Sequence, residues 1–276
     1  METESAELKG PRLKWEGAVR NLEGIKSKVA EFAESDPHRV TVDFESEAGC
    51  HVARMDIRED PDPQLGVMVG EFVHNLRSCL DHIAWQLARL SNSAGVCNKK
   101  RASIYFPVCN SCEQFLKHPV LPFLPEDART FMRRFQPYEG LNEPRDHWLA
   151  GLNMLWNSDK HRVVHAVMTL AHVGQTTFRS GFLSPENDSP VEVESLLRRY
   201  RDTGVYDKAE IAYIRFERSE PDAQKVEVVG HPPVEIRFSA GSIEFSIESL
   251  GNLTAHVADV RTAFALLLQD REGTPS

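Results

Sequence analysis

Residues 63–90 read PQLGVMVGEFVHNLRSCLDHIAWQLARL, and this stretch decides the fold of the first half of the chain. Asp62 and Pro63 stand where the N-cap and the first turn of a helix are expected. The apolar residues that follow recur at helical spacing. At about 100° per residue they form one stripe, which we expect to be buried: Phe72, Leu76, Cys79, Leu80, Ile83, Leu87 and Leu90. The stretch therefore predicts one long central helix over about residues 63–90.

The middle of this helix, residues 74–82, is unusually rich in side chains that donate, accept or titrate. On the helical wheel the residues opposite the apolar stripe are Glu71, His74, Arg77, Ser78, Asp81 and Trp85, with Asn75 and His82 at the border. Arg77 and Asp81 are four residues apart, so they can form an ion pair, and His74 lies beside Arg77. The run predicts a site on this face of the helix.

A second polar cluster, Asp159-Lys160-His161-Arg162, follows a helical pattern that begins near Glu143. Basic residues at the end of a helix are favoured by its dipole. The cluster is also complementary to the central helix, because Arg77 could pair with Asp159 and Asp81 with Arg162. We therefore expect the two clusters to face one another.

The remaining sequence predicts an α+β fold, with a helical part in front and a mainly antiparallel sheet behind it. Apolar residues at helical spacing from Trp15 to Phe32 predict an N-terminal helix, and residues 39–57 read as a small β-hairpin. After residue 162 several short β-branched runs predict antiparallel strands, and the chain ends in a further helix. We expect a helical domain over 1–162 and a β-rich part over 163–276, packed as one unit.

Composition limits the classes of function. The net charge of −9 argues against a broad phosphate-binding surface, although it allows a local basic patch. The polar N-terminus has no secretory signal, and the apolar runs are too short to span a bilayer, so we expect a cytoplasmic protein. Five cysteines suit a reducing compartment. Cys109 and Cys112 could bind zinc together with Cys97 and His118, or they could be free thiols.

Arg77 and His82 form an R-x4-H motif. This motif resembles that of the HEPN superfamily, small helical domains in which R-x4–6-H often serves as a ribonuclease site, commonly at a dimer interface. The resemblance covers about a third of the chain. It implies cleavage of RNA without metal, by a homodimer, with Arg77 contacting the phosphate and His82 as general acid or base. The other candidate site residues are His74, Asp81, His161 and Arg162.

The longer pattern H-N-L-R-S-x-L-D-H, followed far downstream by D-K-H-R, is similar to one in a group of uncharacterised bacterial proteins. This resemblance implies a bacterial source and no particular activity.

Two other interpretations use the same residues, so the sequence does not decide whether the chain is an enzyme. In the first, the cluster is a structural ion-pair network in a non-catalytic module that binds a protein or a small anionic ligand. In the second, His74, Asp81, His161 and His165 hold one metal ion. The sequence contains no P-loop, nucleophile elbow or dinucleotide fingerprint, and we expect no cofactor.

Overall fold

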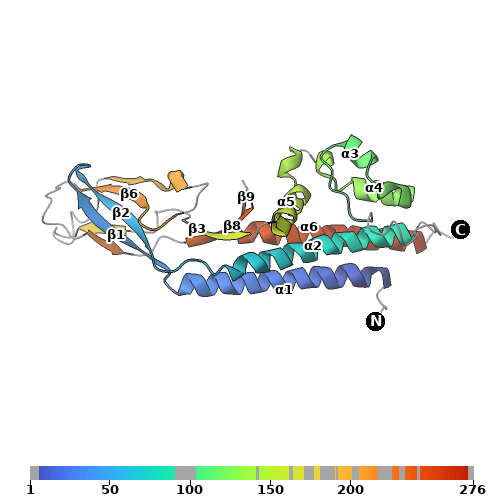
Figure 1. Ribbon diagram of the computed structural model, residues 1–276, viewed down its shortest axis with the longest axis horizontal. Coiled ribbons are helices and arrows are strands. Elements are labelled where there is room, and N and C mark those ends of the chain that lie inside the picture. Colours follow the sequence, from blue (N-terminus) through green and yellow to red (C-terminus); the bar gives the residue numbers. More distant parts are fainter. Residues whose placement is uncertain are drawn as a thin grey trace. The chain divides into compact units, whose positions relative to one another are not determined.

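The computed structural model describes residues 6–90, 104–140, 143–161, 164–170, 177–180, 190, 192–200, 205–216, 226–229, 234–240 and 243–272. The fold is α+β, as predicted. Its elements, labelled in Figure 1 where there is room, are α1 (Ala6–Glu34), β1 (His38–Glu45), β2 (Cys50–Ile57), α2 (Gln64–Arg89), α3 (Cys112–Leu116), η2 (Leu121–Phe123), α4 (Glu126–Arg133), η3 (Pro137–Glu139), η4 (Pro144–Asp146), α5 (Trp148–His161), β3 (His165–Leu170), β4 (Thr177–Ser180), β5 (Glu192–Ser195), η5 (Leu197–Tyr200), β6 (Glu210–Arg215), β7 (Val226–Val229), β8 (Val234–Ala240), β9 (Ile243–Phe245) and α6 (Ile247–Glu272).

The chain forms two compact units. The helical unit contains Met1–Lys26, Gln64–His165 and Ala240–Ser276, and the sheet unit contains Ser27–Pro63 and Ala166–Ser239. This division differs from the expected boundary at residue 162, because the hairpin belongs to the sheet unit and the last helix to the helical unit. Both assignments depend on packing between residues that are far apart in the sequence, and local sequence patterns do not predict such packing. That the two parts pack as one body stays a prediction.

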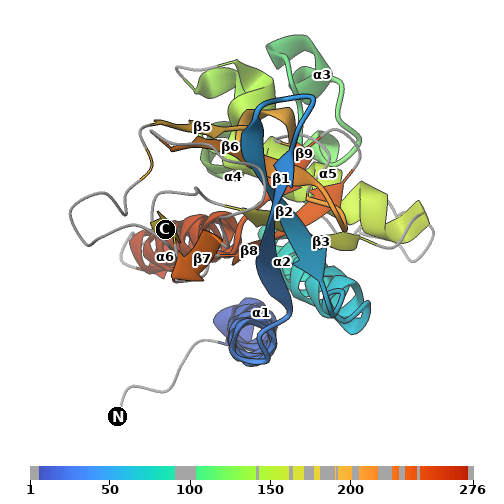
Figure 2. The same ribbon diagram turned by 90° about the vertical axis from the view of Figure 1, so that its left-hand side faces the viewer.

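In the helical unit, the long helices α1, α2 and α6 lie side by side, and Figure 2 shows them viewed along their axes. The indole of Trp15 in α1 donates a hydrogen bond to the carbonyl of Thr254 in α6 over 3.1 Å. In α5, Trp148 stacks on His256 of α6 with ring centroids 5.2 Å apart. The apolar stripe predicted for the central helix is buried from Phe72 to Leu87, which confirms the predicted core of α2.

Helix α1 lies against α2 along a row of glycines spaced seven residues apart. A Cβ added to Gly10 would lie 2.6 Å from the ring of His82, and one added to Gly17 would lie 3.2 Å from the amide of Asn75. At Gly24 the nearest atom would be the terminal methyl of Met68, at 3.1 Å. The partner positions on α2 are also seven apart, in the opposite direction. The two helices are therefore antiparallel, and the missing side chains allow their close approach.

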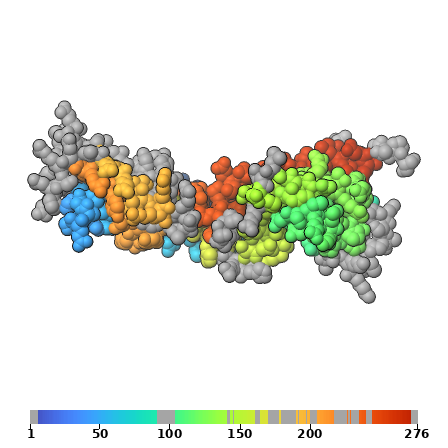
Figure 3. Space-filling model, turned by 90° about the horizontal axis from the view of Figure 1, so that it is seen from above, coloured from blue at the N-terminus to red at the C-terminus, as the bar shows by residue number. Residues whose placement is uncertain are grey.

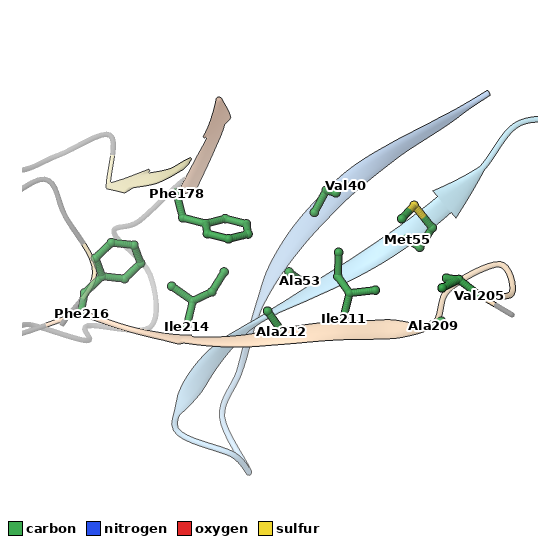
Figure 4. Close-up of a cluster of buried hydrophobic side chains, with 10 residues drawn as sticks. All are labelled: Val40, Ala53, Met55, Phe178, Val205, Ala209, Ile211, Ala212, Ile214 and Phe216. Atoms are coloured by element: carbon green, nitrogen blue, oxygen red, sulfur yellow. The ribbon is translucent and has the colours of Figure 1, made fainter. Parts of the chain in front are cut away.

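The sheet unit is built around a four-stranded antiparallel sheet in the order β1-β2-β6-β5. A two-stranded antiparallel sheet, β4-β7, supplies Phe178 to the same apolar core, and β3 pairs with β8. Figure 4 shows this core, whose buried members are Val40, Ala53, Met55, Phe178, Val205, Ala209, Ile211, Ala212, Ile214 and Phe216. The hairpin and the antiparallel strands are thus confirmed. The short exposed strand β5 had no clear sequence signal, because it lacks the apolar alternation of the other strands.

Candidate functional site

Arg77 is the unexpected residue of the polar run, because its side chain is only 2% exposed. The wheel placed it on the polar side of the helix, but the structure covers that side with α5 and with the segment that precedes Pro107. The guanidinium lies 5.0 Å from the centre of the Trp156 ring in α5. Burial lowers the pKa of Arg77, and the carboxylate of Asp81 opposes this shift. Arg77 is therefore a buried cation that needs a nearby counter-charge.

Asp81 supplies that counter-charge, as the spacing of four residues predicted. Its Oδ1 accepts a hydrogen bond from Nη2 of Arg77 over 3.2 Å and a second from the backbone N–H of Phe106 over 2.9 Å. The same Nη2 donates to the backbone carbonyl of Phe106 over 3.2 Å. Arg77 and Asp81 thus supply hydrogen-bond partners to both the C=O and the N–H of Phe106, which lies in an irregular segment. A neighbouring β-strand would supply the same kind of partners.

Gln136, which the sequence did not single out, completes this arrangement. It is fully buried between α4 and η3, directly before Pro137. Its Oε1 accepts from the backbone N–H of Cys109 over 3.0 Å, and its Nε2 donates to the carbonyls of Pro107 and Met132 over 3.0 and 3.1 Å. We call Arg77, Asp81 and Gln136 the clamp, since together they hold the backbone of residues 106–109. A glutamine near the end of a short helix carries no local signal of such a role.

Within the clamp, hydrogen bonding of Arg77 is incomplete. Among the described residues, its Nε and Nη1 have no hydrogen-bond partner. The cation depends instead on Asp81, on the Phe106 carbonyl and on the face of Trp156. This dependence makes Asp81 the critical partner, because its removal would leave a buried positive charge without compensation.

His82 and Asn75 lie on another side of α2, against α1. The ring of His82 packs over Gly10. The amide of Asn75 donates to Asn21 over 3.0 Å and accepts from Lys14 over 3.4 Å. Desolvation and the nearby Lys14 charge lower the pKa of His82. Arg77 therefore serves the clamp, while His82 lies at the α1 contact, so the two residues of the R-x4-H motif point to different neighbours within this chain.

His74 lies on the exposed surface of α2, near Asp159 of α5. Its Nε2 is 3.3 Å from the hydroxyl of Ser78. Asp159 packs directly on α2 at Gly70, where an added Cβ would be 2.2 Å from Oδ1. Burial raises the pKa of Asp159, and His74 opposes the shift. A depression of about 370 Å³ is lined by Val67, Gly70, Glu71, His74, Asn75 and Asp159.

The two polar clusters therefore meet in part. Asp159 reaches the central helix, but it faces Gly70 and His74, and within the described residues Arg77 forms its ion pair with Asp81. His161 is the last residue of α5, and its side chain is outside the described part of the structure. Arg162 also lies outside the described residues, so its expected pairing with Asp81 stays a prediction.

Neither of the two described cysteines near the clamp, Cys109 and Cys112, is in a disulfide bond. Cys109 is buried and Cys112 is exposed at the start of α3. Burial raises the pKa of Cys109 to about 11, so without a metal this thiol stays protonated at neutral pH. Cys97, the third expected ligand, lies outside the described residues. His118 instead accepts a hydrogen bond from the backbone N–H of Val120 at its Nδ1, over 3.3 Å.

The described part of the chain contains neither a cluster of metal-binding side chains nor a helix that could span a membrane. There, no three His, Cys, Asp or Glu side chains come close enough together to hold a metal ion. No helix in that part has both the length and the apolar character needed to cross a bilayer. The described residues thus give no support to the mononuclear site considered from sequence.

Comparison with models of protein families, with curated proteins and with solved structures found no match to this chain.

Proposed function

We propose that the helical unit is a non-catalytic module that binds a protein partner, and that the polar run of α2 is structural. The structural role of the polar run is supported by one observation above all. The Arg77 guanidinium is buried and is engaged by Asp81 and the Phe106 backbone. A phosphate-binding arginine has to reach its ligand, and a buried arginine that fixes a loop is better explained by stability.

The position of His82 supports the same proposal. A general acid or base has to reach the proton that it transfers, within about 3 Å or through one water. His82 lies against Gly10 of α1, whereas Arg77 lies beneath Trp156 of α5. To contact both Arg77 and His82, a single phosphate group would have to reach around α2 from its α5 side to its α1 side. The HEPN-like ribonuclease, with RNA and a homodimer, stays a prediction that needs a second chain to complete the site.

A cleavage assay distinguishes the two proposals. The full-length protein is incubated with structured and with single-stranded RNA in EDTA, beside Arg77→Met and His82→Ala. The structural proposal predicts no cleavage above buffer by any of the three proteins. Cleavage by the wild type that both substitutions abolish, with both variants still folded by circular dichroism, would contradict it and support the ribonuclease.

A further inference from the structure

Helix α5 begins directly after a histidine that caps it. His147 precedes the first residue of the helix, and its Nδ1 accepts a hydrogen bond from the backbone N–H of Leu149 over 3.2 Å. Its carbonyl accepts from the N–H of Gly151 over 3.1 Å, as the carbonyl of an N-cap residue does. The usual side chains at this position are those of Ser, Thr, Asp and Asn. The cap formed by His147 exists only while Nδ1 carries no proton.

The ring of His147 lies where η3, α5 and α6 meet. A Cβ added to Gly140, just after η3, would lie 3.3 Å from Cδ2 of His147. The ring centroid is 5.5 Å from that of Trp148, which in turn stacks on His256 of α6 with centroids 5.2 Å apart. Figure 3 shows the green segments around α5 on the surface of the helical unit, with the red of α6 beside them. The first turn of α5 is thus joined to α6 through its rings.

Protonation of His147 would act against this arrangement in three ways. It removes the acceptor of the Leu149 N–H. It places a positive charge at the positive end of the α5 dipole. It also adds charge to a partly buried ring, and accordingly burial lowers the pKa of His147 and the charge of His256 lowers it further. A neutral His147 therefore stabilises the first turn of α5, and a protonated one destabilises it.

The other charged groups nearby do not compensate a positive charge at His147. Glu139 of η3 is already engaged in an ion pair. Glu143 and Asp146 of η4 are exposed, as is Asp259 of α6, and among the described residues none of them forms an ion pair with an imidazole. The side chain of Arg145 lies outside the described part of the structure. The charge of a protonated ring would thus remain unpaired there.

The second half of α5 is held by different contacts. The ring of Trp156 lies 5.0 Å from the guanidinium of Arg77, and Asp159 packs on Gly70. Both contacts join α5 to α2 and lie two or more turns beyond the His147 cap. A change at His147 therefore acts first on the beginning of the helix.

We propose that His147 is an acid-sensitive latch, which holds the first turn of α5 against α6 while its ring is neutral and releases that turn when the ring is protonated. In the released state Trp148 leaves its stack on His256, whereas the second half of α5 stays on α2. Mild acid thereby detaches one end of α5 from the helical unit without unfolding the unit.

Amide hydrogen exchange at Leu149 in the full-length protein tests the latch, once protection factors are corrected for the intrinsic pH dependence of exchange. Between pH 7 and pH 5, the protection of Leu149 in the wild type should fall at least threefold. The limit is about 25-fold, because pH 5 lies about 1.5 pH units below the ordinary histidine pKa. Over the same range, protection of the Trp156 amide in the second half of α5 should change less than twofold.

Three variants assign the effect to the latch. His147→Asn supplies a cap that does not titrate, so protection of Leu149 should no longer depend on pH. The matched control, His82→Asn, changes a histidine that lies against α1 and should keep the wild-type fall. His256→Phe keeps a ring on Trp148 but removes the charge, so the midpoint of the fall should move to higher pH.

Protection of Leu149 that stays constant between pH 7 and pH 5 in the wild type would overturn the proposal. So would a fall of the same size in His147→Asn. Equal falls at Leu149 and Trp156 would also contradict it, because they would show that acid destabilises the whole helix. If His147→Asn fails to fold, His256→Phe decides, and a midpoint that stays in place or moves to lower pH would exclude the latch.

Discussion

The two packed sides of α2 accommodate polar side chains in different ways. Toward α5, the charged residues Arg77 and Asp81 are held by hydrogen bonds to each other and to the backbone of Phe106. Toward α1, Asn75 and His82 fit over glycines that leave room for them. The first side depends on compensation of charge, and the second depends on shape. Dense polarity on a helix therefore marks two kinds of packing here, and neither one requires a catalytic site.

The largest expected effect comes from breaking the charge-dependent side. Asp81→Ala should cost about 3–5 kcal/mol in free energy of unfolding, because it leaves the buried Arg77 cation without its counter-charge. Chemical denaturation measures the loss. His82→Ala, on the shape-dependent side, should cost less than about 1 kcal/mol, since the residue is only partly covered by α1 and its removal leaves no buried charge unpaired. Equal losses in the two variants would contradict the distinction between the sides.

A somewhat smaller effect is expected at the other end of the clamp. Gln136→Ala should cost about 3 kcal/mol, because it removes three hydrogen bonds to buried backbone groups, and of these groups the Met132 carbonyl keeps a second donor in the N–H of Phe135. The matched control is Gln114→Ala, whose amide caps the exposed backbone N–H of Asn110. That control should cost less than about 1 kcal/mol. If Gln136→Ala cost no more stability than Gln114→Ala, Gln136 would not belong to the clamp, and only the contacts of Arg77 and Asp81 with Phe106 would remain.

On the shape-dependent side, Gly17→Leu should cost about 1–3 kcal/mol, because the new side chain would meet the Asn75 amide at once. Gly251→Leu in α6 is the control, since an added Cβ there meets no atom within 4 Å. Removing the helical glycine should make that variant as stable as the wild type or more so. If both substitutions had the same effect, the row of glycines would not set the distance between α1 and α2.

The smallest expected effect is a dependence of stability on pH. Burial lowers the pKa of His82, His118 and His147 in the folded protein. The folded state then binds fewer protons than the unfolded state below about pH 6.5, the ordinary histidine value. Stability should be complete above that pH and fall as the pH drops through it. Denaturation at pH 7.5 and 5.5 measures the fall, and His118→Asn should reduce it.

Local periodicity predicted much of the fold. The span of α2, the hairpin and the final helix follow from patterns within each segment, and the Arg77–Asp81 pair follows from helical spacing. The burial of Arg77 could not be predicted in this way, because residues 104–109 and Trp156 cover it from elsewhere in the chain. Gln136 had no local signal either. The glycines at 10, 17 and 24, matched by Met68, Asn75 and His82, were a readable signal of close helix packing.

Amide hydrogen exchange at Phe106 tests the central claim most directly, because its N–H donates to Asp81 in the middle of an irregular segment. The structural account predicts strong protection in the wild type. It also predicts that Asp81→Ala abolishes this protection while amides in the middle of α2 remain protected. Exchange at Phe106 in the wild type as fast as in an exposed loop would contradict the claim that Arg77 and Asp81 of α2 hold this segment.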